Sequence, residues 1–116
     1  MADAHRLETA DGTVVAEHLE IADTIWSRFM GLMFRGELPA GHGLLIRPCG
    51  SIHMFFMRFA LDAAFVDGDG RVIRVYCGLR PWRTTRFIRG AKACLELPAG
   101  TLSAAGVGVG DVLRLD

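Results

Sequence analysis

The stretch that decides the fold reads AAFVDGDGRVIRVY and covers residues 63–76. Two runs rich in apolar residues flank the turn sequence DGDG at 67–70. Asp-Gly pairs allow the positive φ angles that tight hairpins require, so the stretch predicts two antiparallel strands joined by a short turn. Arg71 and Arg74 interrupt the second run, which indicates a strand that is buried on one side only.

A second Asp-Gly pair, at 11–12, predicts another hairpin between residues 5–10 and 13–21. Further short apolar runs predict strands at 44–46, 91–97 and 112–115. Many short strands with few helices indicate a mainly β fold, a compact antiparallel barrel or sandwich with one or two short helices.

The best helix candidate begins at Asp23 or Thr24, either of which can cap it, and we expect it to end at Gly36. Its apolar residues recur at helical spacing, and we expect them to pack in the core. They are Ile25, Trp26, Phe29, Leu32 and Met33. One further helical turn is expected at 101–105.

The composition predicts one domain, residues 1–116, with a packed core: 51% of the residues are hydrophobic and 22% are charged. Neither a disulfide framework nor a zinc knuckle fits the three cysteines, and the fold requires no cofactor. We expect a cytoplasmic protein without a membrane partner. There is no signal-like stretch, unless a leader was removed, and no apolar run nears the ~18 residues that span a bilayer. The oligomeric state is left open.

Charge is segregated along the chain, although the formal net charge is zero. Residues 1–23 carry six acids and one base, whereas residues 71–92 carry seven bases and no acid. Such segregation can mark a surface for anions, but the neutral total favours mutual neutralisation of the two segments. No nucleic-acid recognition motif is present, so no nucleic-acid partner is expected.

One polar cluster interrupts an aromatic and methionine-rich run. In an extended segment, Cys49, Ser51 and His53 share one face. Arg58 and Asp62 follow shortly afterwards. A buried carboxylate needs a partner, and we expect Asp62 to find one in Arg58 or His53.

Five segments in order resemble the family catalogued as domain of unknown function 192. They read RFMGLMFR at 28–35, SIHMFFMRFALD at 51–62, LRPW at 79–82, LELPAG at 95–100 and GD at 110–111. The likeness extends from about Val14 to Leu115. Met54 stands where the family commonly has threonine, and Ala60 where it commonly has proline. The resemblance implies a mostly β, barrel-like or sandwich fold and implies no activity, because none is established for the family.

Three functional hypotheses follow from these residues. The first is a binding site for a small polar or anionic ligand near Ser51, His53, Arg58 and Asp62, bordered by Trp82. Arg58 would balance the ligand's charge, and His53 and Ser51 would donate hydrogen bonds.

The second hypothesis is a hydrolase-type enzyme that uses His53 with Cys49 or Asp62. Cys49 is a possible nucleophile, which would need a lowered pKa and an adjacent base. No catalytic residue is assigned, and whether the protein is an enzyme stays open. The spacing of His42, Cys49, His53 and Asp62 does not match a zinc site, so no metal is expected.

The third hypothesis is an accessory domain that contacts a protein partner through the arginine-rich segment from Arg71 to Arg89. Trp82, between Arg80 and Arg83, has the chemistry to stack on a sugar or a base. We slightly favour a structural role for Trp82, covering one end of the barrel.

Overall fold

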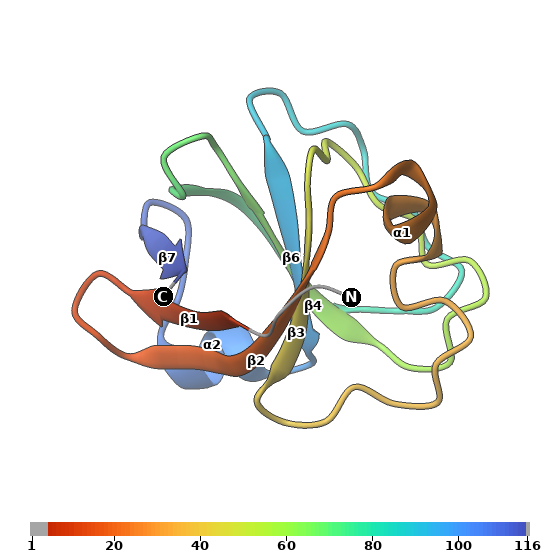
Figure 1. The fold of residues 1–116 in the computed structure, drawn as a ribbon, viewed down its shortest axis with the longest axis horizontal. Helices are drawn as coiled ribbons and strands as arrows, with labels where there is room; N and C mark the ends of the chain where they lie inside the picture. Colours follow the sequence, from red (N-terminus) through yellow and green to blue (C-terminus); the bar gives the residue numbers. More distant parts are fainter. Residues whose placement is uncertain (1–4, 116) are drawn as a thin grey trace.

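A computed structural model describes residues 5–115 as one curled sheet of seven strands with two short helices (Figure 1). In chain order the elements are β1 (His5–Thr9), β2 (Val14–Ala22), α1 (Ile25–Met30), β3 (His42–Ile46), β4 (Leu61–Val66), β5 (Val72–Leu79), β6 (Ala93–Pro98), α2 (Thr101–Ala105) and β7 (Leu113–Leu115). The sheet order is β5-β4-β6-β3-β2-β1-β7. The outer strands approach each other at one bridge, between Arg71 and Val112. The predicted mainly β fold is confirmed.

Both predicted hairpins are present. β1 and β2 pair antiparallel, and so do β4 and β5. Gly70 ends the second turn with a φ of +82°, and a Cβ there would lie 2.4 Å from the carbonyl oxygen of Leu113. The turn therefore requires glycine for its conformation and for its space.

One strand pair departs from the expected antiparallel sheet. β2 and β3 run parallel, from His18 opposite His42 to Ala22 opposite Ile46. Parallel neighbours need a crossover connection, and here the crossover consists of residues 23–41 and includes α1. It places α1 at the right-hand end of the molecule in Figure 1, beside the long loops that flank β4 and β5.

Alternation along β6 divides the core into two clusters, one on each face of the sheet. Leu95 and Leu97 pack with Leu102 of α2 in one cluster. Cys94 packs in the other cluster, with Leu32, which lies in the crossover shortly after α1. α2 therefore closes one face of the sheet, and the crossover covers the other.

α1 begins where the sequence predicts but ends earlier. The Thr24 side chain accepts a hydrogen bond from the N–H of Ser27 (3.0 Å), so the predicted cap is confirmed. The helix ends at Met30, and its C-cap Gly31 lies five residues before Gly36. Neither helix within residues 5–115 has the length and apolar character needed to cross a membrane.

The prediction that the apolar stripe of this segment is core is wrong for its first three members. Ile25 is 85% exposed, Trp26 69% and Phe29 58%, and α1 has no buried residue. Only Leu32 and Met33, which follow the helix, are buried. Helical spacing reveals an apolar face but does not tell whether that face meets the core.

Candidate functional site

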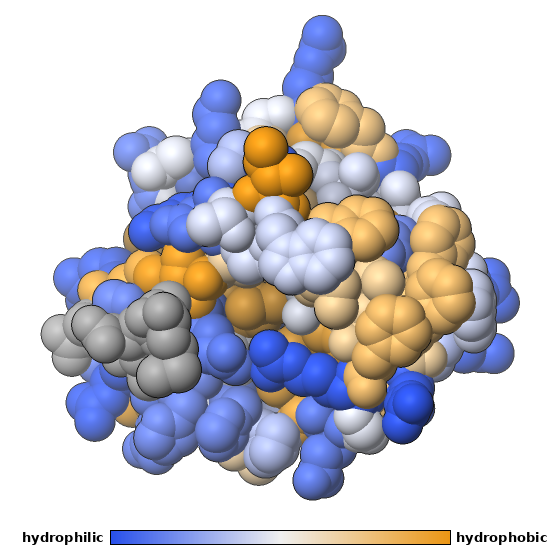
Figure 2. Space-filling model, turned by 45° about the vertical axis from the view of Figure 1, so that its right-hand side comes forward, coloured by the Kyte–Doolittle hydropathy of each residue, from blue (hydrophilic) through white to orange (hydrophobic). Residues whose placement is uncertain are grey.

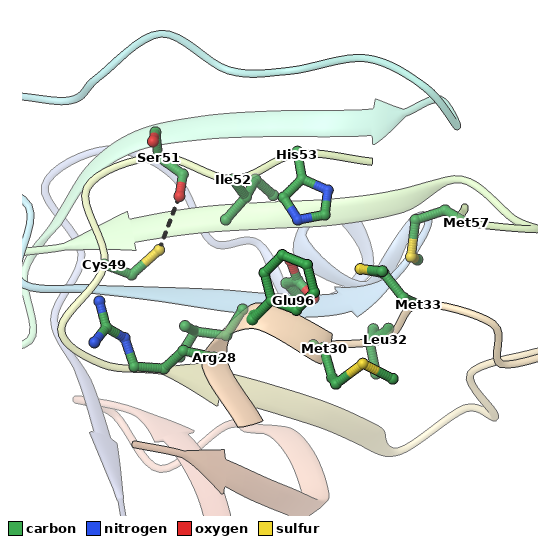
Figure 3. Close-up of a pocket in the computed structure, with 13 residues that line it drawn as sticks. Arg28, Met30, Leu32, Met33, Cys49, Ser51, Ile52, His53, Met57 and Glu96 are labelled. Carbon is green, nitrogen blue, oxygen red and sulfur yellow. Dashed lines mark hydrogen bonds between the residues drawn. The ribbon is translucent and has the colours of Figure 1, made fainter. Parts of the chain in front are cut away.

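A cavity lies beneath the crossover, against β3 and β6 (Figure 3). Its volume is about 60 Å³, which is room for a few water molecules or one small polar group. The polar and charged side chains that line it are Arg28, Cys49, Ser51, His53 and Glu96. Apolar side chains, several of them methionines, form the remaining walls.

The loop that supplies three of these side chains, residues 49–53, is fixed by a later loop. The N–H of Cys49 donates to the carbonyl of Lys92 (3.1 Å). The ring of Phe87 packs on Gly50 so closely that a Cβ there would lie 2.5 Å from a ring carbon. Both contacts hold this wall of the cavity in one position.

Glu96 forms the base of the cavity. It belongs to β6, between β4 and β3 in the sheet, and it is only 4% exposed. Within residues 5–115 its carboxyl has no hydrogen bond and no ion pair. Burial raises its pKa from the ordinary 4.5 to about 8; nearby Cys49 adds to the rise, and Arg35 opposes it. At neutral pH Glu96 is therefore mostly protonated and able to donate a hydrogen bond.

Sequence reasoning missed Glu96, although a signal was present. The residue interrupts the apolar run ACLEL at 93–97. The argument that singled out Asp62, a carboxylate among apolar neighbours, applies equally here.

His53 closes the cavity from the opposite side, above Glu96 in Figure 3. The N–H of Phe55 donates to its Nδ1 (3.2 Å), which assigns the ring proton of a neutral imidazole to Nε2. Rings of Phe29 and Phe55 lie 6.3 Å and 5.0 Å from the imidazole, between centroids. Its Nε2–H is available to a guest.

Cys49 lies at the edge of the same cavity. Its thiol donates to the carbonyl of Ser51 (3.1 Å), the dashed line in Figure 3. The neighbouring Cys94 side chain lowers the pKa of the Cys49 thiol, and the positive charge of Arg28 contributes, against the effect of burial. Burial raises the pKa of Cys94 well above its ordinary value. In the described part of the chain, no hydrogen bond joins Cys49 to His53.

Asp62 has different partners from those predicted. It is fully buried, and its carboxylate accepts from three backbone N–H groups: Gly78 (2.9 Å), Gly100 (3.1 Å) and Leu102 (3.0 Å). No ion pair with Arg58 and no hydrogen bond with His53 occurs within residues 5–115. Backbone donors satisfy this carboxylate, and it does not line the cavity.

The structure therefore brings together Ser51 and His53, with Cys49, but not Arg58 or Trp82. Both of these are exposed and lie outside the cavity lining. Of the four residues considered as metal ligands, Cys49 and His53 line the cavity but His42 and Asp62 do not, and the His42 ring packs against that of His18 at 4.9 Å between centroids. Among residues 5–115, no three His, Cys, Asp or Glu side chains are grouped to hold a metal ion.

Comparison with known sequences gives a clear relationship. The DUF192 family model, described as "Uncharacterized ACR", matches residues 6–115. The chain belongs to this family. A UPF0127 protein of Pyrococcus furiosus is 35% identical to this DUF192 chain, over 93% of the chain and 95% of the relative. A UPF0127 protein of Pyrococcus abyssi is 36% identical, over 80% and 81%.

Two solved structures share the fold of this DUF192 domain. A protein of unknown function from Novosphingobium aromaticivorans superposes with a TM-score of 0.82 at 25% identity, covering 96% of this chain and 83% of that one. A Sinorhizobium meliloti protein described as a candidate transcription regulator has a TM-score of 0.80 at 28% identity, covering 99% and 94%. The comparisons establish family and fold, and the site must be interpreted from its own chemistry.

Proposed function

We propose that this domain binds a small ligand whose polar end enters the cavity and forms hydrogen bonds with Glu96 and His53. The observation that carries the proposal is the Glu96 carboxyl, buried in a cavity without a partner in the described chain. Its carboxyl oxygens are accessible from the cavity, because no enclosed side-chain nitrogen or oxygen of residues 5–115 lacks a hydrogen-bond partner. A guest in the cavity would take the place of water at these oxygens, where the low local dielectric strengthens each hydrogen bond.

The surroundings of the cavity suggest the size of the guest. A wider surface hollow of about 360 Å³ adjoins it and shares Arg28, Phe29, Cys49, Ser51 and His53 with it. Small-molecule sites usually start near ~300 Å³ and combine apolar walls with a few polar groups. The hollow would hold the body of the ligand, and the inner cavity would hold its polar end.

The protonation states favour a ligand end that accepts hydrogen bonds. Glu96 is mostly neutral near pH 7 and Nε2 of His53 carries a proton, so both groups offer donors. Arg28 adds a positive charge at the lining. A carboxylate or carbonyl oxygen fits this set, whereas a cation would require Glu96 to ionise.

A hydrolase remains the second candidate, because Cys49 has a lowered thiol pKa in the same cavity as a buried acid. It is ranked lower because the thiol bonds to Ser51 rather than to His53. Without a base beside it, the thiol lacks the activation that hydrolytic cysteines share.

The test is thermal melting of the protein with a panel of small carboxylates, amides and amines, at pH 6 and pH 9. A bound carboxylate should raise the melting temperature more at pH 6, where Glu96 is protonated. Glu96→Gln should keep amide binding but remove this pH dependence, while Glu17→Gln, at an exposed position of β2, serves as the matched control. The proposal would be contradicted if only amines raised the melting temperature and if the rise were larger at pH 9. Turnover of an ester that disappears in Cys49→Ser would favour the hydrolase.

A further inference from the structure

The end of the molecule that carries α1 exposes a network of large apolar side chains. Ring contacts with centroid distances of 4.9–6.3 Å link its aromatic members one to the next. The linked rings are Trp26, Phe29, His53, Phe55, Trp82, Phe56 and Phe34. We call these rings, together with the exposed Ile25 and Phe87, the aromatic face. Figure 2 shows apolar rings gathered over this end, with separate hydrophilic side chains between them.

The exposed apolar area is large for so small a protein. The eight apolar members are between 41% and 85% exposed. At roughly 200 Å² for each fully exposed side chain, they present on the order of 1,000 Å² to solvent. The largest apolar patch of a typical monomer is about 300–600 Å² and often functional.

Backbone strain holds three of the rings outward. Phe34, Phe56 and Trp82 have φ angles of +66°, +61° and +68°, and they are the only non-glycine residues with positive φ within residues 5–115. Bulky residues rarely adopt this conformation, and it costs about 1–3 kcal/mol at each position. All three rings contact one another in sequence, Phe34 on Phe56 and Phe56 on Trp82. Strain concentrated at one exposed cluster indicates a surface shaped for a purpose beyond folding.

The segments that form the aromatic face are entirely without acidic residues. Residues 24–35, 48–60 and 79–92 contain eight basic side chains and no Asp or Glu. The basic residues are Arg28, Arg35, Arg58, Arg80, Arg83, Arg86, Arg89 and Lys92. Of these eight basic residues, only Arg35 forms an ion pair within the described chain, with Glu20. The expected neutralisation of residues 71–92 by the acidic N-terminal segment therefore does not occur through ion pairs in residues 5–115.

We propose that the aromatic face docks on the surface of an anionic lipid bilayer. Apolar side chains would enter the boundary between headgroups and acyl chains, and the unpaired arginines would contact lipid phosphates. Docking at a surface needs no long apolar run, which is why the sequence alone gives no sign of it.

The shape and charge of the face favour lipid over other partners. Ile25 and Phe87 line the rim of the surface hollow and Trp26 lies beside the ring of Phe29, yet all three are 69–85% exposed, so most of each side chain faces solvent. A protein partner would need a separate pocket for each, whereas a fluid bilayer accepts them without matched shape. An exposed isoleucine offers no stacking surface to a nucleic-acid base. A second copy of the chain would bring two arginine-rich faces together, which like-charge repulsion opposes.

Both tryptophans of the chain, Trp26 and Trp82, belong to the aromatic face, so intrinsic fluorescence reports on it directly. The experiment titrates the full chain with vesicles of about three parts phosphatidylcholine to one part phosphatidylglycerol, and with pure phosphatidylcholine. We expect co-sedimentation and a blue shift of tryptophan emission with the anionic vesicles, and much weaker effects with the neutral ones.

Two kinds of variant separate the apolar from the charged contribution. Ile25→Ser should weaken partition to the anionic vesicles about tenfold, whereas Val109→Ser, 67% exposed in the turn before β7, should leave it unchanged. Arg83→Gln and Arg86→Gln should each weaken it about fivefold, whereas Arg6→Gln on β1 should not. Circular dichroism of each variant verifies that it is folded.

Three outcomes would overturn the proposal. The first is that neither a shift nor co-sedimentation occurs with anionic vesicles. The second is that a single-stranded oligonucleotide quenches both tryptophans while vesicles have no effect, which would make the face a nucleic-acid surface. The third is that analytical ultracentrifugation finds a dimer, that Ile25→Ser dissociates this dimer, and that the protein does not bind vesicles.

Discussion

Two buried carboxyl groups lie one position apart on neighbouring strands and face opposite sides of the sheet. Asp62 of β4 is opposite Leu97 of β6, and the next pair joins Ala63 to Glu96. Because side chains alternate along a strand, Asp62 points toward α2 while Glu96 points toward the crossover and its cavity. The same residue chemistry therefore meets two different environments within a single pair of strands.

The difference between the two lies in their donors. Asp62 accepts hydrogen bonds from three backbone N–H groups, one in β5 and two at the start of α2, and so connects both elements to β4. Glu96 receives none in the described chain and instead lines a cavity. A carboxylate supplied with donors stabilises the fold, and a carboxyl left without them is available to a guest.

The largest expected effect comes from removing the satisfied group. Asp62→Ala leaves three amides without an acceptor, including the buried one of Leu102, and should lower the free energy of unfolding by on the order of 4 kcal/mol. Urea denaturation at pH 7 measures it. Asp62→Asn, which keeps one acceptor oxygen, should lose less. A loss below about 1 kcal/mol for the alanine variant would mean that the three bonds do not support the fold.

Removing the ionisable carboxyl of Glu96 should have the opposite effect on stability, and the effect should depend on pH. Between pH 4.5 and 8, folded Glu96 holds a proton that the unfolded chain has released, so the free energy of unfolding falls as pH rises. The fall approaches 1.4 kcal/mol per pH unit within this window. Glu96→Gln should be free of this contribution and more stable than the unmutated protein at pH 9. Denaturant titrations from pH 5 to 9 measure the free energy of unfolding of both proteins. If the two free energies change with pH in parallel, Glu96 is not protonated in the folded state.

A smaller effect is expected for His53→Ala. The side chain makes one hydrogen bond, with the N–H of Phe55, and is only partly buried, so the loss of stability should be about 1 kcal/mol. Any ligand-induced rise in melting temperature should disappear at the same time. A different result would make His53 a structural residue like Asp62. In that case the variant melts several degrees lower, and no compound changes the melting temperature of either the variant or the unmutated protein.

The smallest expected effect on stability is that of alkylating Cys49. Its pKa is lowered, so iodoacetamide should modify it at a lower pH than an ordinary thiol, while buried Cys94 stays protected in the folded chain. Mass spectrometry of the digested protein identifies the modified residue. Cys94→Ala should raise the pH of half-modification, because it removes the side chain that lowers the Cys49 pKa. An unchanged pH profile would exclude Cys94 as the cause.

The two hairpins and the helical turn at 101–105 were predictable because Asp-Gly pairs, and the glycine at 100, act on the backbone locally. The parallel pairing of β2 with β3 was not, since no local signal fixes which strands meet. Asp62 was recognised as needing a partner, but the donors are backbone amides, which every residue except proline carries and which sequence patterns do not mark. Glu96 was missed, and with it the base of the cavity.

The pairing of β1 with β7 has a consequence for how the chain acquires its structure. Residues near the two ends of the sequence are neighbours, with Leu7 opposite Leu115 and Thr9 opposite Leu113. During synthesis, β1 leaves the ribosome well before β7 and lacks one of its two partner strands until β7 emerges. Such non-local pairing slows folding, so an exposed β1 edge should mark the nascent chain as a client for holding chaperones.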